Sequence, residues 1–432
     1  MTRIMELDTM EDKHSKLDRR NFLKTVGVVG LGSVLAGCSR KKQEKEPQTV
    51  EPNVAAKAQQ LQQVPKRKLG KTGLQVPILS LGTMFNLLDN QIILKRCLDF
   101  GVNCWDTSNV YAGGNSELGI GKFILDNPQI RKNLFIVTKA LDVTTGEGME
   151  KCLQLSLERM KTSYIDLHFF HDLRDPAALN DEIRKWAADA KKRKLIRFFG
   201  FSTHKNMAQC LNAAAKLDWI DAVMTVYNFR LMQDPEMQTA IDGCHKANIG
   251  LIAMKTQGAG PVARWAGHTP QIETDADKKI VDHFFQKGFT EGQAKLKLIM
   301  DDQRFASVCV GMETVGFITE NVAAALDKVK LTSRDVAVLK EYADATCGSY
   351  CAGCGHICDL ALPDAPYVSD IMRYLMYYNN YGQKDWAKEL FAQMPNNVGS
   401  KLLGMDYTIA EARCPQHLPI GKLVAEAVEK LA

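Results

Sequence analysis

The stretch Leu134–Ala140, with the sequence LFIVTKA, is a short apolar run that ends in a lysine and an alanine. A run that is apolar on both faces is typical of a strand in a parallel sheet covered by helices. Similar runs recur along the chain at Ile78–Met84, Cys104–Ser108, Ile165–His171, Ile196–Thr203, Ala222–Asn228, Ile249–Thr256 and Ser307–Met312. Amphipathic patterns between them, such as Met149–Lys161 and Pro235–Ala247, indicate helices.

Eight such β/α units over residues 66–333 predict an α/β fold, a closed (β/α)8 TIM barrel, which commonly takes about 250 residues. The rival is an open doubly wound sheet. It is disfavoured because no Gly-x-Gly-x-x-Gly follows a strand in this sequence. The chain has 432 residues, so we expect a second, smaller and mainly helical unit at residues 334–432.

The composition describes an ordinary globular chain with a large core, since 45% of the residues are hydrophobic and 24% are charged. The formal net charge is +5, and the basic residues are not interleaved with aromatic ones as in a nucleic-acid-binding surface. We therefore expect no nucleic-acid partner. A basic run at residues 40–45 is better suited to lie near anionic lipid head groups.

Residues 1–37 have the pattern of an export signal. Arg19 and Arg20, followed by Phe22-Leu23-Lys24, resemble a twin-arginine signal. The apolar run Val26–Ala36 is shorter than the about 20 residues that a membrane-spanning helix needs. A buried core helix is the alternative, but it would leave the arginine pair unexplained. We expect export by the twin-arginine route to the periplasmic or cell-surface side.

Cys38 closes the sequence Leu-Ala-Gly-Cys, which resembles the lipobox of bacterial lipoproteins. This resemblance implies that the Cys38 thiol carries a lipid that anchors the protein to the membrane. Plain cleavage and release is the alternative. Residues 38–65 are rich in Lys, Gln, Glu and Pro without periodicity, so they are expected to form a flexible tether.

Residues 67–76, with the sequence RKLGKTGLQV, resemble the opening hairpin of the aldo/keto reductase family, and the similarity continues to about Val329. The resemblance implies an oxidoreductase that exchanges a hydride between a nicotinamide cofactor, NAD(P)H, and a carbonyl or alcohol. Its catalytic group maps onto Asp106, Tyr111, Lys139 and His171, at the strand ends where barrel enzymes place their chemistry.

The chemistry explains these residue types. Tyr111 would be the general acid that protonates the carbonyl oxygen, and the Lys139 ammonium would lower its pKa from near 10 toward neutrality. Asp106 would pair with Lys139, and His171 would orient the carbonyl. His168, on the same strand as His171, is expected to be structural.

The cofactor pocket departs from the family pattern. The family's Gly-x-Ser-Asn motif appears as Gly200–Thr203, so Ser202 is kept and the asparagine is lost, and a family glutamine is Met224 here. The resemblance assigns cofactor binding to Ser202, Met254, Lys255, Glu320 and Asn321. The basic residues that hold a 2′-phosphate fall on Gly311 and Phe317, which implies a weak preference for NADH.

Beyond the barrel, Cys351-x2-Cys354-x3-Cys358 and a distant Cys414-Pro415 resemble ferredoxin-type ligation of one [4Fe-4S] cluster. Gly353 and Gly355 would allow the loop to turn sharply. Cys347 is a spare neighbour or substitute ligand. Zinc, with His356 as an optional ligand, and disulfides are the alternatives. Six further cysteines have no ligand-like spacing and are expected to be small buried hydrophobic residues: Cys97, Cys104, Cys152, Cys210, Cys244 and Cys309.

Together these features predict an exported, lipid-anchored oxidoreductase with an iron–sulfur cluster for electron relay or structure. A periplasmic or membrane electron carrier would be its partner, beside a small carbonyl or alcohol substrate. The alternative is a non-catalytic or electron-transfer lipoprotein whose barrel is only a binding scaffold. The aromatic stretch from Ile371 to Met394 is expected to pack the second unit onto the barrel rather than to bind a cofactor.

Overall fold

The computed structural model describes residues 61–432, except 142, 259–271, 363–366, 396–398 and 400. The predicted signal and Cys38 lie outside the described residues. Eight parallel strands close into a barrel in chain order, with the last strand pairing the first. Their bounds are β3 (Leu79–Gly82), β4 (Cys104–Asp106), β5 (Phe135–Ala140), β6 (Ile165–Phe170), β7 (Ile196–Thr203), β8 (Ala222–Val226), β9 (Gly250–Met254) and β10 (Phe305–Gly311). The eight predicted strands are therefore confirmed.

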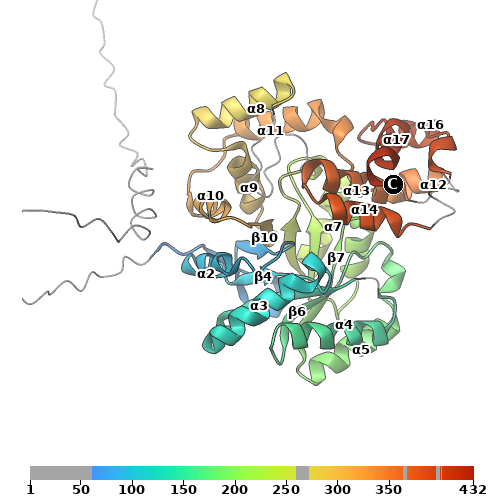
Figure 1. Ribbon diagram of the computed structural model, residues 1–432. Helices are drawn as coiled ribbons and strands as arrows, with labels where there is room; N and C mark the ends of the chain where they lie inside the picture. The colour runs from blue at the N-terminus through green and yellow to red at the C-terminus, as the bar shows by residue number, and fades with distance from the viewer. Residues whose placement is uncertain (1–60, 142, 259–271, 363–366, 396–398, 400) are drawn as a thin grey trace, which may run out of the picture. The chain divides into compact units, whose positions relative to one another are not determined.

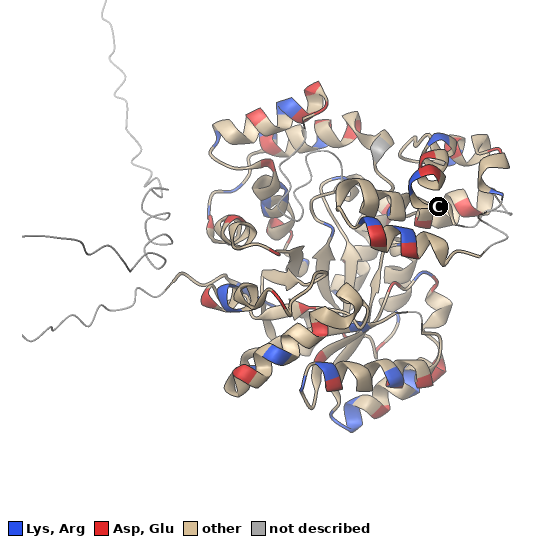
Figure 2. Ribbon diagram, viewed as in Figure 1, with Lys and Arg blue, Asp and Glu red and all other residues tan. Residues whose placement is uncertain are grey.

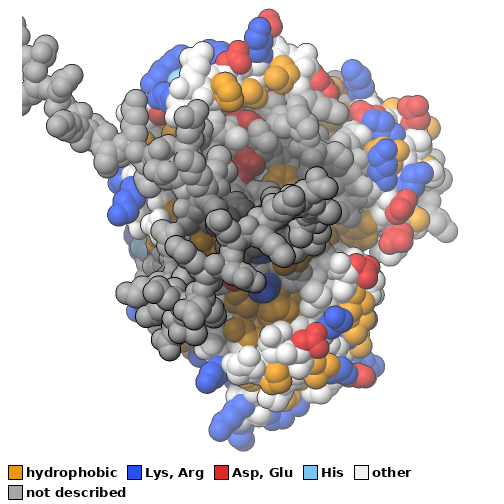
Figure 3. All heavy atoms as spheres, turned by 60° about the vertical axis from the view of Figure 1, so that its left-hand side comes forward, with side chains coloured by type: hydrophobic (Ala, Val, Ile, Leu, Met, Phe, Trp, Pro, Cys, Tyr) orange, Lys and Arg blue, Asp and Glu red, His pale blue; other side chains and the backbone are white. Residues whose placement is uncertain are grey.

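An outer layer of helices covers the barrel. Its members are α2 (Gln91–Asp99), α3 (Asn115–Asp126), α4 (Gly146–Arg159), α5 (Asp181–Lys192), α6 (Met207–Ala214), α7 (Pro235–Lys246), α8 (Asp275–Gln286), α9 (Glu291–Asp301), α10 (Val315–Leu326) and α11 (Ser333–Ala345). Many of their charged residues are on the outside, although α9 buries Glu291, Lys295 and Lys297, and the strands carry few charges (Figure 2). On the face shown in Figure 3, basic and acidic side chains are interspersed around the edge of the molecule.

The opening hairpin lies at the N-terminal ends of the barrel strands. Strands β1 (Lys66–Lys68) and β2 (Gln75–Pro77) pair in antiparallel fashion. Between them, Leu69 is completely buried, and Lys71 N donates to Asn248 O, just before β9. The hairpin therefore covers one end of the barrel, so the opposite, C-terminal ends of the strands are the ones that can hold a site.

A second helical unit follows α11 and has a core of its own. It contains α12 (Gly355–Ala361), α13 (Val368–Asn380), α14 (Lys384–Ala392), α16 (Thr408–Arg413) and α17 (Ile420–Leu431). We call residues 351–432 the helical module. Its core runs from Cys358 to Leu431, whereas α11 packs on α8 in a cluster with Phe229. Figure 1 shows the helices of the module gathered beside one end of the barrel. Among the described residues, no helix is both long and apolar enough to span a membrane.

Buried ion pairs hold the module on the barrel. Arg373 of α13 donates from Nη1 to both carboxylate oxygens of Asp172, each at 2.9 Å, directly after β6 and His171. Arg373 also bonds Asp370 at 3.1 Å, and Lys205, after β7, contacts the same Asp370 at 3.1 Å. Burial acts against the charge of Asp172, but Arg373 and then Arg174 hold its pKa well below the ordinary range.

The cysteine loop itself also touches the barrel. Gly353 has φ +78° and lies against the backbone of His204, where any Cβ would overlap the His204 carbonyl. Its own carbonyl accepts from Asn206 N at 2.9 Å. Gly353 is therefore required both for its left-handed backbone and for this close approach, which confirms the predicted sharp turn there.

We predict that Arg373→Met lowers the free energy of unfolding by about 3 kcal/mol at pH 7, because it leaves Asp172 buried with only Arg174 as an ion partner. The pKa of folded Asp172 is depressed, so the ion pair contributes stability above pH about 4 and loses it as the pH falls further. The difference between variant and wild type should therefore shrink toward pH 3. Urea unfolding at several pH values measures it.

Arg184→Met is the matched control, because Arg184 pairs with Asp181 on an exposed face, with side chains 52% and 77% exposed. This substitution should change stability by less than about 1 kcal/mol at any pH. An equal loss in both variants, or a loss for Arg373→Met that does not shrink at all between pH 7 and pH 3, would contradict the role of the buried pair.

Candidate active site

The C-terminal ends of three neighbouring strands bring the four predicted catalytic residues together. Asp106 ends β4, Tyr111 begins the 3-10 turn Tyr111–Gly114, Lys139 is in β5, and His171 directly follows β6. The Lys139 ammonium donates to Asp106 Oδ2 at 2.8 Å and to the Tyr111 hydroxyl at 3.2 Å. The arrangement is the one expected of a proton-donating tyrosine beside a fixed cation. Asp106, Tyr111 and His171 line one pocket, which we call the tetrad pocket, and Lys139 contacts it through Asp106 and Tyr111.

His171 is held by a neighbour and by packing. Its Nδ1 lies 3.1 Å from Ser108 Oγ, and its ring meets the ring of Tyr111 edge-on at 5.8 Å between centroids. The other ring nitrogen of His171, Nε2, is therefore the one placed to hydrogen-bond to an oxygen of a ligand. Burial, together with the nearby Lys139, lowers the pKa of His171 to about 3, so the ring is neutral at pH 7.

The protonation state of Tyr111 differs from the expectation. Burial is the largest influence and raises its pKa to about 12, although Lys139 acts to lower it. The sequence-based prediction of a pKa drawn toward neutrality is therefore wrong for this structure, because desolvation outweighs the ammonium. Tyr111 carries its proton at neutral pH. It is thus ready to protonate an oxyanion and poorly prepared to accept a proton.

Aromatic residues of the helical module also line the tetrad pocket. Tyr377 and Tyr381 come from α13 and its end, and Trp386 comes from α14. The rings of Tyr377 and Trp386 stack with centroids 4.9 Å apart. The expectation that this aromatic stretch is only packing is therefore too narrow. The signal was the i, i+4 spacing of Tyr377 and Tyr381, which puts both on one face of a helix.

These rings leave little space in the tetrad pocket. It holds about 80 Å³, whereas small-molecule pockets usually hold about 300–1,000 Å³. A ligand of ordinary size would therefore need Tyr377, Tyr381 or Trp386 to shift.

Lys255 and Cys309 also line the tetrad pocket. Lys255 follows β9, and its ammonium lies 4.6 and 4.5 Å from the ring centroids of Tyr377 and Tyr381. Burial, and then the charge of Arg373, lowers the pKa of Lys255 to about 7. Cys309 of β10 is buried, as expected, and burial raises its pKa well above the ordinary value. No feature of the sequence indicated that Cys309 would line this pocket.

The residues expected to hold a nicotinamide fit it only in part. Met224 and Met254 line the tetrad pocket, and a thioether wall suits a flat ring. Ser202 Oγ instead accepts from Asp172 N at 3.1 Å, and Thr203 Oγ1 donates to Leu173 O at 2.7 Å. These two side chains support the loop after β6 and do not line the pocket. Met224 and Met254 thus offer an apolar wall to a nicotinamide ring, and neither Ser202 nor Thr203 offers a side-chain grip on its amide.

The residues expected at the adenosine end lie apart from the tetrad pocket. Both are in α10, where Glu320 accepts from Thr290 Oγ1 at 2.5 Å and Asn321 is buried. Neither lines the pocket, although Gly311 does. The structure therefore gathers the four catalytic residues, Met254 and Lys255, and it does not gather Ser202, Glu320 and Asn321 with them.

The four predicted cysteine ligands line a single small pocket, which we call the cysteine pocket. Cys351, Cys354 and Cys358 come from the loop and α12, and Cys414 follows α16. Cys347 does not line this pocket, and neither does His356, whose Nδ1 contacts Asn206 Oδ1 at 3.1 Å. Burial, followed by the neighbouring thiol of Cys414, raises the pKa of Cys354 to about 11. The thiols are thus close enough to influence one another.

The spacing of these thiols bears on what they could hold. In the described part of the chain, no three His, Cys, Asp or Glu residues are grouped to hold one metal ion. A zinc ion would need every sulfur about 2.3 Å from one point, whereas a four-iron cluster meets each cysteine through a separate iron. All cysteines of the described part are free, so it contains no disulfide.

Comparisons with known proteins give the family. The sequence model of the Aldo/keto reductase family matches residues 79–344. An aldo-keto reductase of Alternaria alternata is 24% identical over 261 residues, which cover 50% of this chain and 71% of that protein. L-glyceraldehyde 3-phosphate reductase of Escherichia coli is 23% identical over 322 residues, which cover 65% of this chain and 92% of that protein.

A solved structure is similar in fold. The aldo-keto reductase from Klebsiella pneumoniae, in complex with NADPH, superposes with a TM-score of 0.51 at 18% identity. The match covers 64% of this chain and 94% of that one. The family match ends at residue 344, near the end of α11, so the cysteine pocket lies outside it.

Proposed function

Because the chain belongs to the aldo/keto reductase family and is an oxidoreductase of that family, we propose that it reduces a carbonyl substrate with NAD(P)H. The observation that carries the proposal is the contact of one buried lysine, Lys139, with both Asp106 and the hydroxyl of Tyr111. The names of the relatives are consistent with small carbonyl substrates.

The nicotinamide supplies a hydride to the carbonyl carbon when it is bound, and Met254 would lie against its ring. Tyr111 donates its proton to the carbonyl oxygen, and the Lys139 ammonium then stabilises the phenolate. In the tautomer that carries its proton on Nε2, His171 would donate to the same oxygen and orient it. Tyr377 and Trp386 keep water out of the pocket. Gly311 and Phe317 offer no charge to a 2′-phosphate, so we propose a weak preference for NADH.

We also propose that Cys351, Cys354, Cys358 and Cys414 hold one [4Fe-4S] cluster that relays electrons or stabilises the module. Their shared pocket supports this proposal, and so does the absence of His356 and Cys347 from it. Each thiol would lose its proton on binding iron. The free energy of iron binding would offset the cost of deprotonation that the raised thiol pKa implies.

Export and anchoring are further parts of the proposal, and they rest on the sequence alone. Arg19 and Arg20 support the twin-arginine route, and Cys38 supports a lipid anchor on the far side of the membrane. A carrier of electrons in that compartment would then be a partner, because free NAD(P)H is scarce there.

Tyr111→Phe should lower kcat for aldehyde reduction by about 100- to 10,000-fold, because it removes the proton donor and little else. NAD(P)H oxidation with a panel of aldehydes measures kcat, and cofactor fluorescence measures binding, which should stay within about twofold. Tyr164→Phe is the matched control, because Tyr164 does not line the tetrad pocket. Its ring instead packs against Arg131, whose Cζ lies 3.8 Å from the ring centroid.

The pH profile gives a second test of the same residue. With a Tyr111 pKa of about 12, reduction should be nearly independent of pH from 6 to 9, while alcohol oxidation should rise with pH. Unchanged kcat in Tyr111→Phe would remove the tyrosine from the mechanism and favour the scaffold alternative. A fall in reduction above pH 7 would show instead that the phenol has a lowered pKa in the complex.

Replacing any one of Cys351, Cys354, Cys358 or Cys414 by Ser should remove most of a broad absorbance near about 400 nm from anaerobically purified protein. Cys347→Ser and Cys210→Ser are controls that should retain it, because neither residue lines the cysteine pocket. Iron and sulfide analysis should give about four of each per chain in the wild type. Colourless wild-type protein with one zinc per chain would contradict the cluster.

A further inference from the structure

The cysteine pocket lies between two larger spaces. One, which we call the inner cavity, holds about 610 Å³ and is lined by Cys351, Lys255 and Tyr381. The other, which we call the outer groove, holds about 740 Å³ and is lined by Cys354. Ala352 and Gly353 line both spaces. The cysteine loop is therefore the wall that separates the inner cavity from the outer groove.

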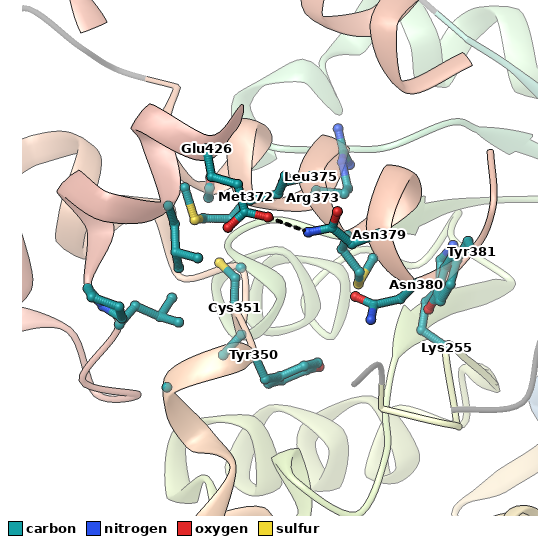
Figure 4. A pocket seen from close by; sticks show the side chains of 18 of the residues that line it. Lys255, Tyr350, Cys351, Met372, Arg373, Leu375, Asn379, Asn380, Tyr381 and Glu426 are labelled. Atoms are coloured by element: carbon teal, nitrogen blue, oxygen red, sulfur yellow. Dashed lines mark hydrogen bonds between the residues drawn. The ribbon is translucent and has the colours of Figure 1, made fainter. Parts of the chain in front are cut away.

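The inner cavity borders the tetrad pocket. Lys255, His204 and Tyr381 line both the cavity and the pocket. Figure 4 shows Cys351 pointing into the cavity near its centre, with Lys255 and Tyr381 beside each other at one side. A cluster on the four cysteines would thus face the catalytic side through Cys351 and the outside through Cys354.

The outer groove has an acidic rim. Asp344 is in the last turn of α11 and Glu236 is in the first turn of α7, and both are exposed, while Asp234 caps α7. Arg230 is the one Lys or Arg among the described residues that line the groove, and it is buried. Its guanidinium donates to Gly258 O at 2.9 Å and to Thr346 at 2.8 Å. The accessible charge of the groove is therefore negative.

We propose that the outer groove is the docking site of a positively charged one-electron carrier protein. This proposal rests on the proposed cluster. Cys354 brings the edge of that cluster to the groove, and the acidic rim attracts a basic surface around the carrier's redox centre. One electron passes from the reduced cluster to the oxidised carrier, or in the reverse direction, and no proton or bond changes with it.

The test uses the full chain, reduced with dithionite and freed of excess reductant, and cytochrome c, a basic one-electron haem protein, as the probe. Its reduction is followed by stopped-flow absorbance at several salt concentrations. The rate constant should fall steeply as salt rises, because opposite charges are screened. The double variant Glu236→Lys/Asp344→Lys should be at least about tenfold slower at low salt and should lose the salt dependence.

The matched control is Asp126→Lys/Glu147→Lys, which makes the same charge change on α3 and α4 at residues with 63% and 78% exposed side chains. It should react like the wild type. Reduction of a small uncharged quinone dye, and the absorbance near about 400 nm, should be the same in all three proteins.

The outcomes separate the two proposals. A coloured, dye-active protein whose cytochrome rate is equal in wild type and in Glu236→Lys/Asp344→Lys overturns the docking site alone. Equal slowing by the control variant also overturns it, since net charge and not the groove would then matter. A chain without a cluster that reduces no cytochrome overturns both proposals.

Discussion

The bidentate ion pair between Asp172 and Arg373 fixes the geometry on which the rest of the site depends. It joins the residue next to His171 to the middle of α13, so it links a catalytic strand end to the helix that carries Tyr377. A buried pair is weak evidence for stability, but its strict geometry makes one docking arrangement much better than its neighbours. Because both carboxylate oxygens are engaged, the module cannot slide along the barrel mouth without leaving charge buried and unpaired.

Burial also explains the electrostatics of the pocket, whose wall includes Tyr377, Tyr381 and Trp386 of the module. It is the largest cause of the raised pKa of Tyr111, the lowered pKa of His171 and the lowered pKa of Lys255. All three shifts favour neutral side chains around the reacting atoms, while Lys139 keeps its charge because Asp106 and Tyr111 outweigh its burial. The site therefore holds one fixed cation in a dry surrounding, which suits the stabilisation of a developing negative charge.

The sequence predicts best what depends on local pattern. Alternation of apolar runs and amphipathic helices indicated all eight strands. The resemblance to the family indicated the tetrad, whose members fall at strand ends that a barrel brings to one face. The ligand spacing around Cys351 is local as well. Ser202, Thr203 and Glu320 show the limit of such reasoning, since their side chains bond to nearby loops that no motif reveals. The aromatic wall of Tyr377, Tyr381 and Trp386 depends on long-range docking, which periodicity does not encode.

The wall of the tetrad pocket has a consequence for how the protein matures. A ribosome releases the barrel strands first and the segment with Trp386 and Cys414 last. Until that segment emerges, a nascent barrel would have its four catalytic residues at an open, wet mouth. The pocket and the cysteine pocket are then completed by the same final stretch of chain, in one docking event. A truncated product would thus lack both the aromatic wall of the tetrad pocket and the last of the four cysteines of the cysteine pocket.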